Sequence, residues 1–211
     1  MNVQVPSGTL RLEGILAVPS APKGAVVFAH GSGSGRFSSR NQYVAGVLQE
    51  AGLATLLIDL LAEGEEADRR NVFDIPLLAD RLQSAADWLA EEPQTKQLRL
   101  GYFGASTGAG AALIAAGRQP KNVAAVVSRG GRPDLAGTWL HTVEAPTLLI
   151  VGGNDEDVLG LNEAALAQLR CPKQLVVIPG ATHLFPEPGA LEEVARLAKE
   201  WFGQHLSDAV R

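Results

Sequence analysis

Residues 98–118 read LRLGYFGASTGAGAALIAAGR, and this stretch decides the fold that the sequence predicts. A short apolar run is followed by the pattern G-x-S-x-G at Gly104–Gly108 and then by an alanine-rich segment with helical spacing. Small residues around Ser106 let a strand turn sharply into a helix, and such a turn raises a serine hydroxyl above the sheet. The same pattern also fits a plain strand-to-helix turn in which Ser106 caps the helix. Its meaning therefore depends on its surroundings.

More strands and helices flank this unit. Continuous runs rich in Val, Leu and Ile are typical of strands buried on both faces of a parallel sheet. These runs cover 25–29, 54–58, 123–127, 147–151 and 174–178, and helical spacing covers 38–51, 75–92, 106–118, 161–169 and 189–205. Residues 3–5 and 9–18 predict an antiparallel hairpin at one edge. The sequence therefore predicts an α/β fold, with a mostly parallel eight-stranded sheet between helices, and one domain over residues 1–211.

The composition excludes several classes of protein. Of the 211 residues, 46% are hydrophobic and 19% charged, which is typical of a soluble globular domain. A net charge of -5 without any Lys/Arg run argues against nucleic-acid and membrane partners. One cysteine, Cys171, excludes an internal disulfide and a cysteine-based zinc site. The first twenty residues lack the pattern of a signal peptide, so we expect a cytoplasmic protein. We also expect it to be a monomer or a homodimer.

Glycines gather where the predicted strands end. The chain has 23 glycines, whereas a typical composition of about 7% would give about 15. In open α/β sheets, ligands bind at the carboxyl ends of the strands, so the residues that follow each run are the candidates for a site. They are His30–Gly35, Asp59, Gly104–Gly108, Ser128–Arg132, Gly152–Asp155 and Pro179–His183.

A serine hydroxyl becomes a nucleophile only when a base accepts its proton and a carboxylate orients that base. Among the four histidines, His183 lies just beyond the last predicted strand and is the best candidate for the base. His30 is better interpreted as a structural residue that holds the glycine-rich loop. His141 and His205 lie in a connecting segment and on the last helix, so we expect neither to take part.

Asp155 is the best candidate for the carboxylate because it directly follows the strand 147–151. Asp157 and Glu156, in the same turn, remain alternatives. Asp59 also ends a strand, but it precedes the serine in the chain and is better interpreted as a cap. The order serine, aspartate, histidine is the one that accompanies a nucleophile elbow in this architecture.

An acyl-transfer intermediate needs backbone N–H groups that stabilise its oxyanion. The residue after the nucleophile, Thr107, would supply one, and Ser32 in the glycine-rich loop HGSGSG would supply the other. Gly31 and Gly33 would let the loop approach closely. The same loop could cradle a phosphate, but it lacks both the Gly-Lys-Ser/Thr ending of a P-loop and the spacing of a dinucleotide fingerprint.

These residues resemble the α/β-hydrolase superfamily and, more narrowly, its dienelactone hydrolase-like branch. The resemblance rests on HGSGSGR at 30–36, GASTGAG at 104–110, LLIVGGNDEDV at 148–158 and GATHLF at 180–185. It implies an α/β-hydrolase fold in three layers, hydrolysis through an acyl-enzyme, and no cofactor. Dienelactone hydrolases proper use a cysteine nucleophile, whereas this elbow carries Ser106. The chain also resembles a hydrolase module that some bacterial proteins carry fused to a phosphoribosyltransferase-like domain.

Arginines near the strand ends suggest the charge of the substrate. Arg36, Arg129 and Arg132, with Arg40 nearby, could face one opening and bind a carboxylate. Salt bridges to Asp134, Asp155 or the acidic run at 63–66 are the alternative. The polar segment 61–74 could form a short lid over a rather open pocket, which suits small substrates.

Together these features predict a serine hydrolase that cleaves a carboxylic ester, thioester or lactone of a small molecule. An acyltransferase with the same three residues, or a non-catalytic binding protein of the same fold, remains the alternative.

Overall fold

The computed structural model describes residues 1–207, which form one eight-stranded sheet in the order β1-β2-β4-β3-β5-β6-β7-β8. All neighbouring strands are parallel except β1–β2 and β2–β4, which are antiparallel. The strands are β1 (Asn2–Ser7), β2 (Leu10–Ala17), β3 (Ala25–Ala29), β4 (Ala54–Ile58), β5 (Leu100–Ala105), β6 (Val123–Arg129), β7 (Thr147–Gly152) and β8 (Lys173–Ile178). The predicted mostly parallel sheet of eight strands with an antiparallel start is confirmed.

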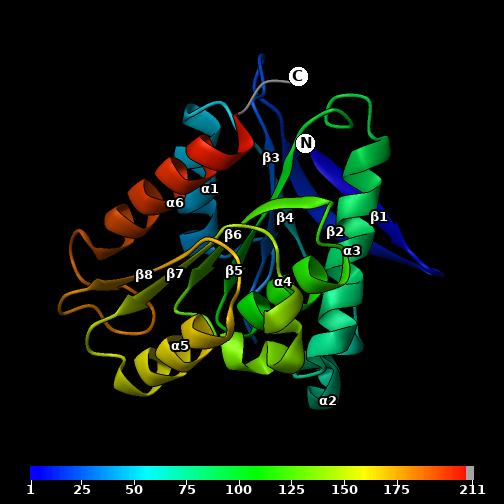
Figure 1. Cartoon of the computed structure of the whole chain (residues 1–211). Coiled ribbons are helices and arrows are strands. Elements are labelled where there is room, and N and C mark those ends of the chain that lie inside the picture. Colours follow the sequence, from blue (N-terminus) through cyan, green and yellow to red (C-terminus); the bar gives the residue numbers. More distant parts are fainter. Residues whose placement is uncertain (208–211) are drawn as a thin grey trace.

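Helices cover both faces of this sheet (Figure 1). On one face α1 (Ser39–Glu50) packs against α6 (Ala190–Leu206). On the other face α4 (Thr107–Arg118) contacts α3 (Ile75–Glu91) and the 3-10 segment η2 (Pro133–Thr142), which in turn contacts α5 (Glu156–Gln168). The short elements η1 (Glu65–Ala67) and α2 (Arg69–Val72) lie between β4 and α3. The helices and the sheet thus form three layers.

Two apolar clusters hold these layers together, one on each face of the sheet. The central strands β3 and β4 are buried along their whole length, so alternate residues of each strand contribute to different clusters. Val27 of β3 packs in the cluster under α3 and α4, whereas Val26 and Phe28 pack in the cluster under α1 and α6. Such burial of nearly continuous apolar strands is what the sequence pattern predicts for a parallel sheet.

Some predicted ends of strands and helices differ from those in the structure. The β5 strand runs to Ala105, two residues past the end of the apolar run, so the serine follows the strand directly. Helix α5 begins at Glu156, five residues before the predicted start. The prediction missed this first turn because it is acidic and lacks apolar residues at helical spacing. The segment 61–74 contains η1 and α2, and the η2 segment was not predicted. Within residues 1–207, none of the helices combines the length and apolar character that crossing a membrane would require.

Candidate active site

Ser106 lies at the sharp turn between β5 and α4. Its backbone has φ 51° and ψ -123°, a region that residues with a side chain rarely adopt. The surrounding turn over-determines this conformation: the Ser106 carbonyl accepts hydrogen bonds from the N–H groups of Ala109 (3.1 Å) and Arg132 (3.0 Å). The Ser106 side chain is therefore held at the N-terminal end of α4, where the helix dipole favours negative charge.

His183 and Asp155 form a hydrogen-bonded pair. The distance between His183 Nδ1 and Asp155 Oδ2 is 2.7 Å, and the Asp155 side chain is 14% exposed against 38% for His183. Asp155 lies between β7 and α5, and His183 lies in the loop between β8 and α6. A carboxylate that accepts the Nδ1–H bond leaves the Nε2 atom of the imidazole free to accept a proton.

The turn after β6 joins these parts of the site. The N–H of Ser106 donates to the carbonyl oxygen of Arg129 at 3.3 Å. Gly130, with φ +49°, lies so close to His183 that a methyl group there would stand 3.0 Å from the His183 carbonyl oxygen and 3.5 Å from its Nδ1. The serine and the histidine therefore flank the same turn, although 77 positions separate them in the numbering.

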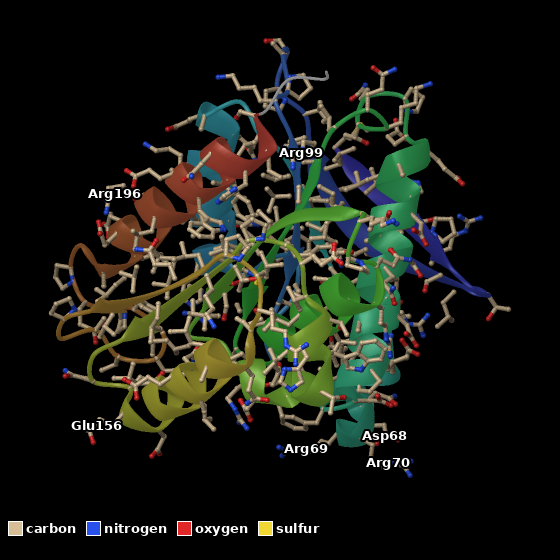
Figure 2. All side chains as sticks on the ribbon, viewed as in Figure 1. Asp68, Arg69, Arg70, Arg99, Glu156 and Arg196 are labelled. Carbon is tan, nitrogen blue, oxygen red and sulfur yellow. The ribbon has the colours of Figure 1, made fainter. Side chains whose placement is uncertain are left out.

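The alternative carboxylates point elsewhere. Asp157 and Glu156 are exposed in the first turn of α5, and Figure 2 shows Glu156 directed away from the protein. Asp59 accepts the Arg36 backbone N–H at 2.6 Å and also forms an ion pair with the Arg36 guanidinium. Asp59 thus anchors the glycine-rich loop, in line with its interpretation as a cap.

The remaining histidines make structural contacts. His30 is buried, its Nδ1 lies 2.9 Å from the carbonyl oxygen of Gly31, and its Nε2 accepts the Leu60 N–H at 3.0 Å. These two bonds tie the end of β3 to the end of β4 and hold the loop, as expected. His141 Nδ1 lies 3.1 Å from the carbonyl oxygen of Gln168, and His205 packs edge-on against Trp201 on α6.

The glycine-rich loop packs directly on the elbow. A methyl group on Gly31 would stand 3.0 Å from Ser106 Cβ, so the absence of a side chain there lets the loop approach Ser106. The Ser32 N–H donates to Thr107 Oγ1 at 3.1 Å. The structure thus brings the two predicted oxyanion donors together, but in this arrangement the Ser32 amide is bonded to the threonine hydroxyl.

The three predicted substrate-binding arginines differ in their surroundings. Arg36 is paired with Asp59, and Arg132 donates to both Asp134 oxygens at 2.9 and 2.8 Å. Both are thus held in ion pairs: the Arg132 pair with Asp134 is the alternative already considered, whereas Asp59 was not among the expected partners of Arg36. Arg129 is 6% exposed, and burial together with the nearby Arg40 lowers its pKa to about 10.

A cavity of about 400 Å³ opens beside the glycine-rich loop. One wall is the loop itself, from His30 to Ser34, and the other is formed by the segment after β4 and by α2 and α3. The latter contributes Leu61, Glu66, Arg69, Val72, Phe73 and Leu78. This volume suits a small ligand. Within the part of the chain that the structure describes, no cluster of three His, Cys, Asp or Glu side chains could hold a metal ion.

No sequence pattern predicted the residues that shape the His183 loop. Glu187 Oε1 accepts both the N–H (3.1 Å) and the hydroxyl (2.6 Å) of Thr182, and these bonds hold the pKa of Glu187 below its usual value. Asn154 bonds across to the same loop through the carbonyl oxygens of Gly180 and Ala181, at 3.0 and 2.9 Å. Only the folded chain brings these partners together.

Comparison with known proteins agrees with this arrangement. Residues 12–206 match the model of the dienelactone hydrolase family. The chain belongs to the dienelactone hydrolase family. It is similar to a dienelactone hydrolase from Anabaena variabilis, whose crystal structure shares 59% identity at a TM-score of 0.96 over 98% of this chain and 97% of that one. The resemblance inferred from the sequence, and the α/β-hydrolase fold that it implied, are confirmed.

The chain is also similar to a more distant solved structure and to longer curated proteins. A Xanthomonas campestris structure described as an α/β serine hydrolase without lid has a TM-score of 0.80 at 21% identity, over 100% of this chain and 96% of that one, which supports the fold alone. A protein from Mycobacterium tuberculosis named "Putative phosphoribosyl transferase" is 62% identical over 97% of this chain. The matched region is 46% of that relative, so this chain spans about half the length of these curated relatives.

Proposed function

We propose that this member of the hydrolase family cleaves carboxylic esters of small molecules, with thioesters and lactones as variants, through an acyl intermediate on Ser106. The observation that carries the proposal is the 2.7 Å bond between His183 Nδ1 and Asp155 Oδ2 beside the strained serine turn. This is the geometry that a serine nucleophile requires, since the base must be oriented and its other nitrogen free.

In the proposed reaction, Ser106 Oγ attacks the ester carbonyl while His183 Nε2 accepts the serine proton. Asp155 keeps the imidazole in the required tautomer and stabilises its charged form. The protonated histidine then donates its proton to the departing alkoxide. Water, deprotonated by the same histidine, attacks the acyl group. The bond between the acyl carbon and Ser106 Oγ then breaks, the histidine returns the proton to Ser106 Oγ, and the acid is released.

The N–H groups of Thr107 and Ser32 would stabilise the oxyanion that forms during each attack. In the free protein the Ser32 N–H donates to the Thr107 hydroxyl. A bond to a charged oxygen is about twice as strong as one between neutral groups. We therefore expect the Ser32 N–H to turn toward the oxyanion when it forms. The cavity beside the loop would receive the acyl or alcohol part of the substrate.

The test is a change of Ser106 to alanine. Ser106→Ala is expected to lower kcat for 4-nitrophenyl acetate on the order of 10⁵- to 10⁶-fold and to abolish the mass increase that a fluorophosphonate probe produces. Ser84→Ala serves as the control and should retain both, because within residues 1–207 the Ser84 hydroxyl of α3 bonds with Asp80 and with Ser7 of β1 and takes no part in the turn at Ser106. Turnover by Ser106→Ala at the parent rate would refute the proposal.

A further inference from the structure

Asn162, in the middle of α5, is a polar side chain without exposed surface. Its Nδ2 atom donates one hydrogen bond to the carbonyl oxygen of Gly131 at 2.9 Å and a second to that of Val158 at 2.8 Å. The Val158 bond lies within α5, whereas the Gly131 bond joins α5 to the turn after β6. Burying an amide costs free energy that its hydrogen bonds must offset. Because Asn162 Oδ1 has no partner within residues 1–207, this offset is incomplete, and stability alone is a poor explanation for the residue.

The turn that accepts the Asn162 bond also holds Ser106. The carbonyl oxygen of Arg129 accepts the Ser106 N–H at 3.3 Å, and the Arg132 N–H donates to the Ser106 carbonyl oxygen at 3.0 Å. Gly131 lies between these two arginines in the chain. A movement of the Gly131 peptide would therefore shift both bonds that fix the strained backbone of Ser106.

Gly131 is also in close contact with the first turn of α4. A methyl group at Gly131 would overlap Ser128 Oγ and stand 2.5 Å from Ala109 Cβ, so only a residue without a side chain fits there. Helices α4 and α5 thus both contact this turn, α4 by packing and α5 through the Asn162 amide.

Helix α5 also positions Asp155. This residue is the N-cap of α5, and its carbonyl oxygen accepts the Leu159 N–H at 2.8 Å. Asn162 follows Asp155 by seven positions. Seven residues are about two helical turns, so both residues lie on the same side of α5. On that side α5 contacts η2, which follows the turn (Figure 1). The bond to Gly131 therefore fixes the distance between the Asp155 side of α5 and the turn that holds Ser106.

His183 depends on both ends of this link. Its Nδ1 atom is bonded to Asp155 Oδ2, and its main chain lies against Gly130, the neighbour of Gly131. A change in the distance between α5 and the turn would therefore move the imidazole relative to Ser106. A displacement of reacting groups by about 1 Å can lower a rate by about 10²-fold.

We propose that Asn162 is a positioning residue, whose amide joins α5 to Gly131 and so sets the place of the Asp155–His183 pair relative to Ser106. Because Asn162 has no exposed surface, it acts through the backbone and not by contact with a substrate. The positioning role rests on the proposed hydrolase function, whereas the link between α5 and the turn does not.

The first test replaces Asn162 with leucine, which has a similar volume and no donor. Asn162→Leu is expected to lower kcat for 4-nitrophenyl acetate by about 10- to 100-fold and to change KM by less than about twofold, since no contact with the substrate is lost. The matched control is Thr147→Val, which removes a buried hydroxyl that donates to the Ala145 carbonyl oxygen at 2.9 Å, at the start of β7. Thr147→Val should retain kcat. Both are assayed at a temperature at which circular dichroism shows them fully folded.

The second test uses Asn162→Asp, which keeps the shape of the side chain and makes its donor depend on pH. A protonated carboxyl group donates one hydrogen bond, whereas a carboxylate donates none and repels the Gly131 carbonyl oxygen. Burial favours the protonated form and raises the pKa of an aspartate. We therefore expect the ratio of kcat of Asn162→Asp to kcat of the parent to fall between about pH 6 and pH 9. The titration of His183 is common to both proteins and cancels in this ratio. For Asn162→Leu the ratio should be low at every pH.

Amide hydrogen exchange separates the link from its effect on the reaction. In Asn162→Leu, exchange at the N–H groups of Ser106 and Arg132 should become faster, because their bonds cross the turn. Unchanged kcat in Asn162→Leu, or an equal loss of kcat in Thr147→Val, would overturn the positioning role. A pH-independent ratio for Asn162→Asp would contradict the need for a donor. If the parent cleaves no ester, the hydrolase proposal fails and the positioning role with it, and the exchange rates still decide whether Asn162 holds the turn.

Discussion

Between β3, α4 and the turn after β6, backbone packs so closely on backbone that a methyl group at Gly108 would overlap the carbonyl oxygens of Ala29 and His30. We call this part, residues 104–110 and 128–132, the elbow wall. The cavity beside the glycine-rich loop has a different kind of wall. We call residues 61–73 the entrance wall; it is built from side chains, and Phe73 there is 51% exposed. Arg69 and Arg70 of the same segment point outward from α2 (Figure 2).

This difference indicates that the two walls have different roles in the candidate site. The elbow wall holds Ser106 and the turn beside His183, the groups that we propose to react, through main-chain contacts, which a substitution alters only by moving the backbone. The entrance wall presents side chains that can change without disturbing the sheet. Changes in the elbow wall and its partners should therefore affect kcat and stability, whereas changes in the entrance wall should affect KM.

Among the changes that compare the two walls and their partners, the largest effect is expected at Asp155, the partner of His183. Asp155→Asn should lower kcat by about 10³- to 10⁴-fold, because the amide favours the wrong imidazole tautomer. Asp157→Asn changes an exposed carboxylate two residues away and is the matched control. Steady-state kinetics with 4-nitrophenyl acetate would measure both. If Asp157→Asn has the larger effect, the assignment of Asp155 is wrong.

A second prediction concerns the tight packing of the elbow wall. Gly108→Ala should lower the free energy of unfolding by about 3 kcal/mol, because the added methyl group must displace backbone and not a movable side chain. Gly160→Ala, in α5, has no atom within 4 Å of the added group and should raise it by about 0.5–1 kcal/mol. Urea unfolding of the two variants compares them directly, and equal stability would contradict the close packing inferred here.

The entrance wall provides the third prediction. Phe73→Ala should raise KM for an ester with an apolar acyl chain by about fivefold, since the lost contact is roughly 1 kcal/mol, a part of what full burial of Phe contributes. The free energy of unfolding should remain close to that of the parent. Trp139→Ala is the control, because that exposed ring packs near Arg118 and outside the cavity. If Phe73→Ala lowers kcat and leaves KM unchanged, the entrance wall does not act on substrate binding as proposed.

The smallest effect is expected in the core below the elbow. Tyr102 is fully buried with an unpartnered hydroxyl, and burial, with a smaller contribution from Asp87, raises the pKa of that group. Above pH 10 the unfolded chain releases this proton while the folded chain keeps it, so the parent loses stability as the pH rises. Tyr102→Phe should remove that part of the loss and change stability at pH 7 by about 1 kcal/mol or less. Urea unfolding at pH 7, 9 and 10.5 would measure the free energy of unfolding of the parent and the variant. If this free energy falls equally with pH in both proteins, the buried hydroxyl does not keep its proton as inferred.

Much of the fold and the core of the site could be predicted because short-range patterns encode them. Apolar runs such as 54–58 are strands because each is buried on both faces, and G-x-S-x-G at 104–108 is a turn because only small residues fit there. The start of α5 was missed because Asp155, Glu156 and Asp157 carry no apolar period. The sequence predicted Ser32 and Thr107 only as two separate backbone donors. The hydrogen bond from the Ser32 N–H to the Thr107 hydroxyl became visible only in the folded loop.

The sequence by itself determined the layered α/β architecture, the family, and the candidates Ser106, Asp155 and His183, since residue type and position after a strand are local properties of the chain. The tertiary structure alone decided which charges are paired. Arg36, Arg129 and Arg132 look alike in the sequence, yet folding pairs two of them with a carboxylate and buries the third, Arg129, for which residues 1–207 provide no carboxylate partner. The physical reason is that electrostatic pairing depends on distances of a few ångströms between segments far apart in the chain, and no periodicity in the sequence records those distances.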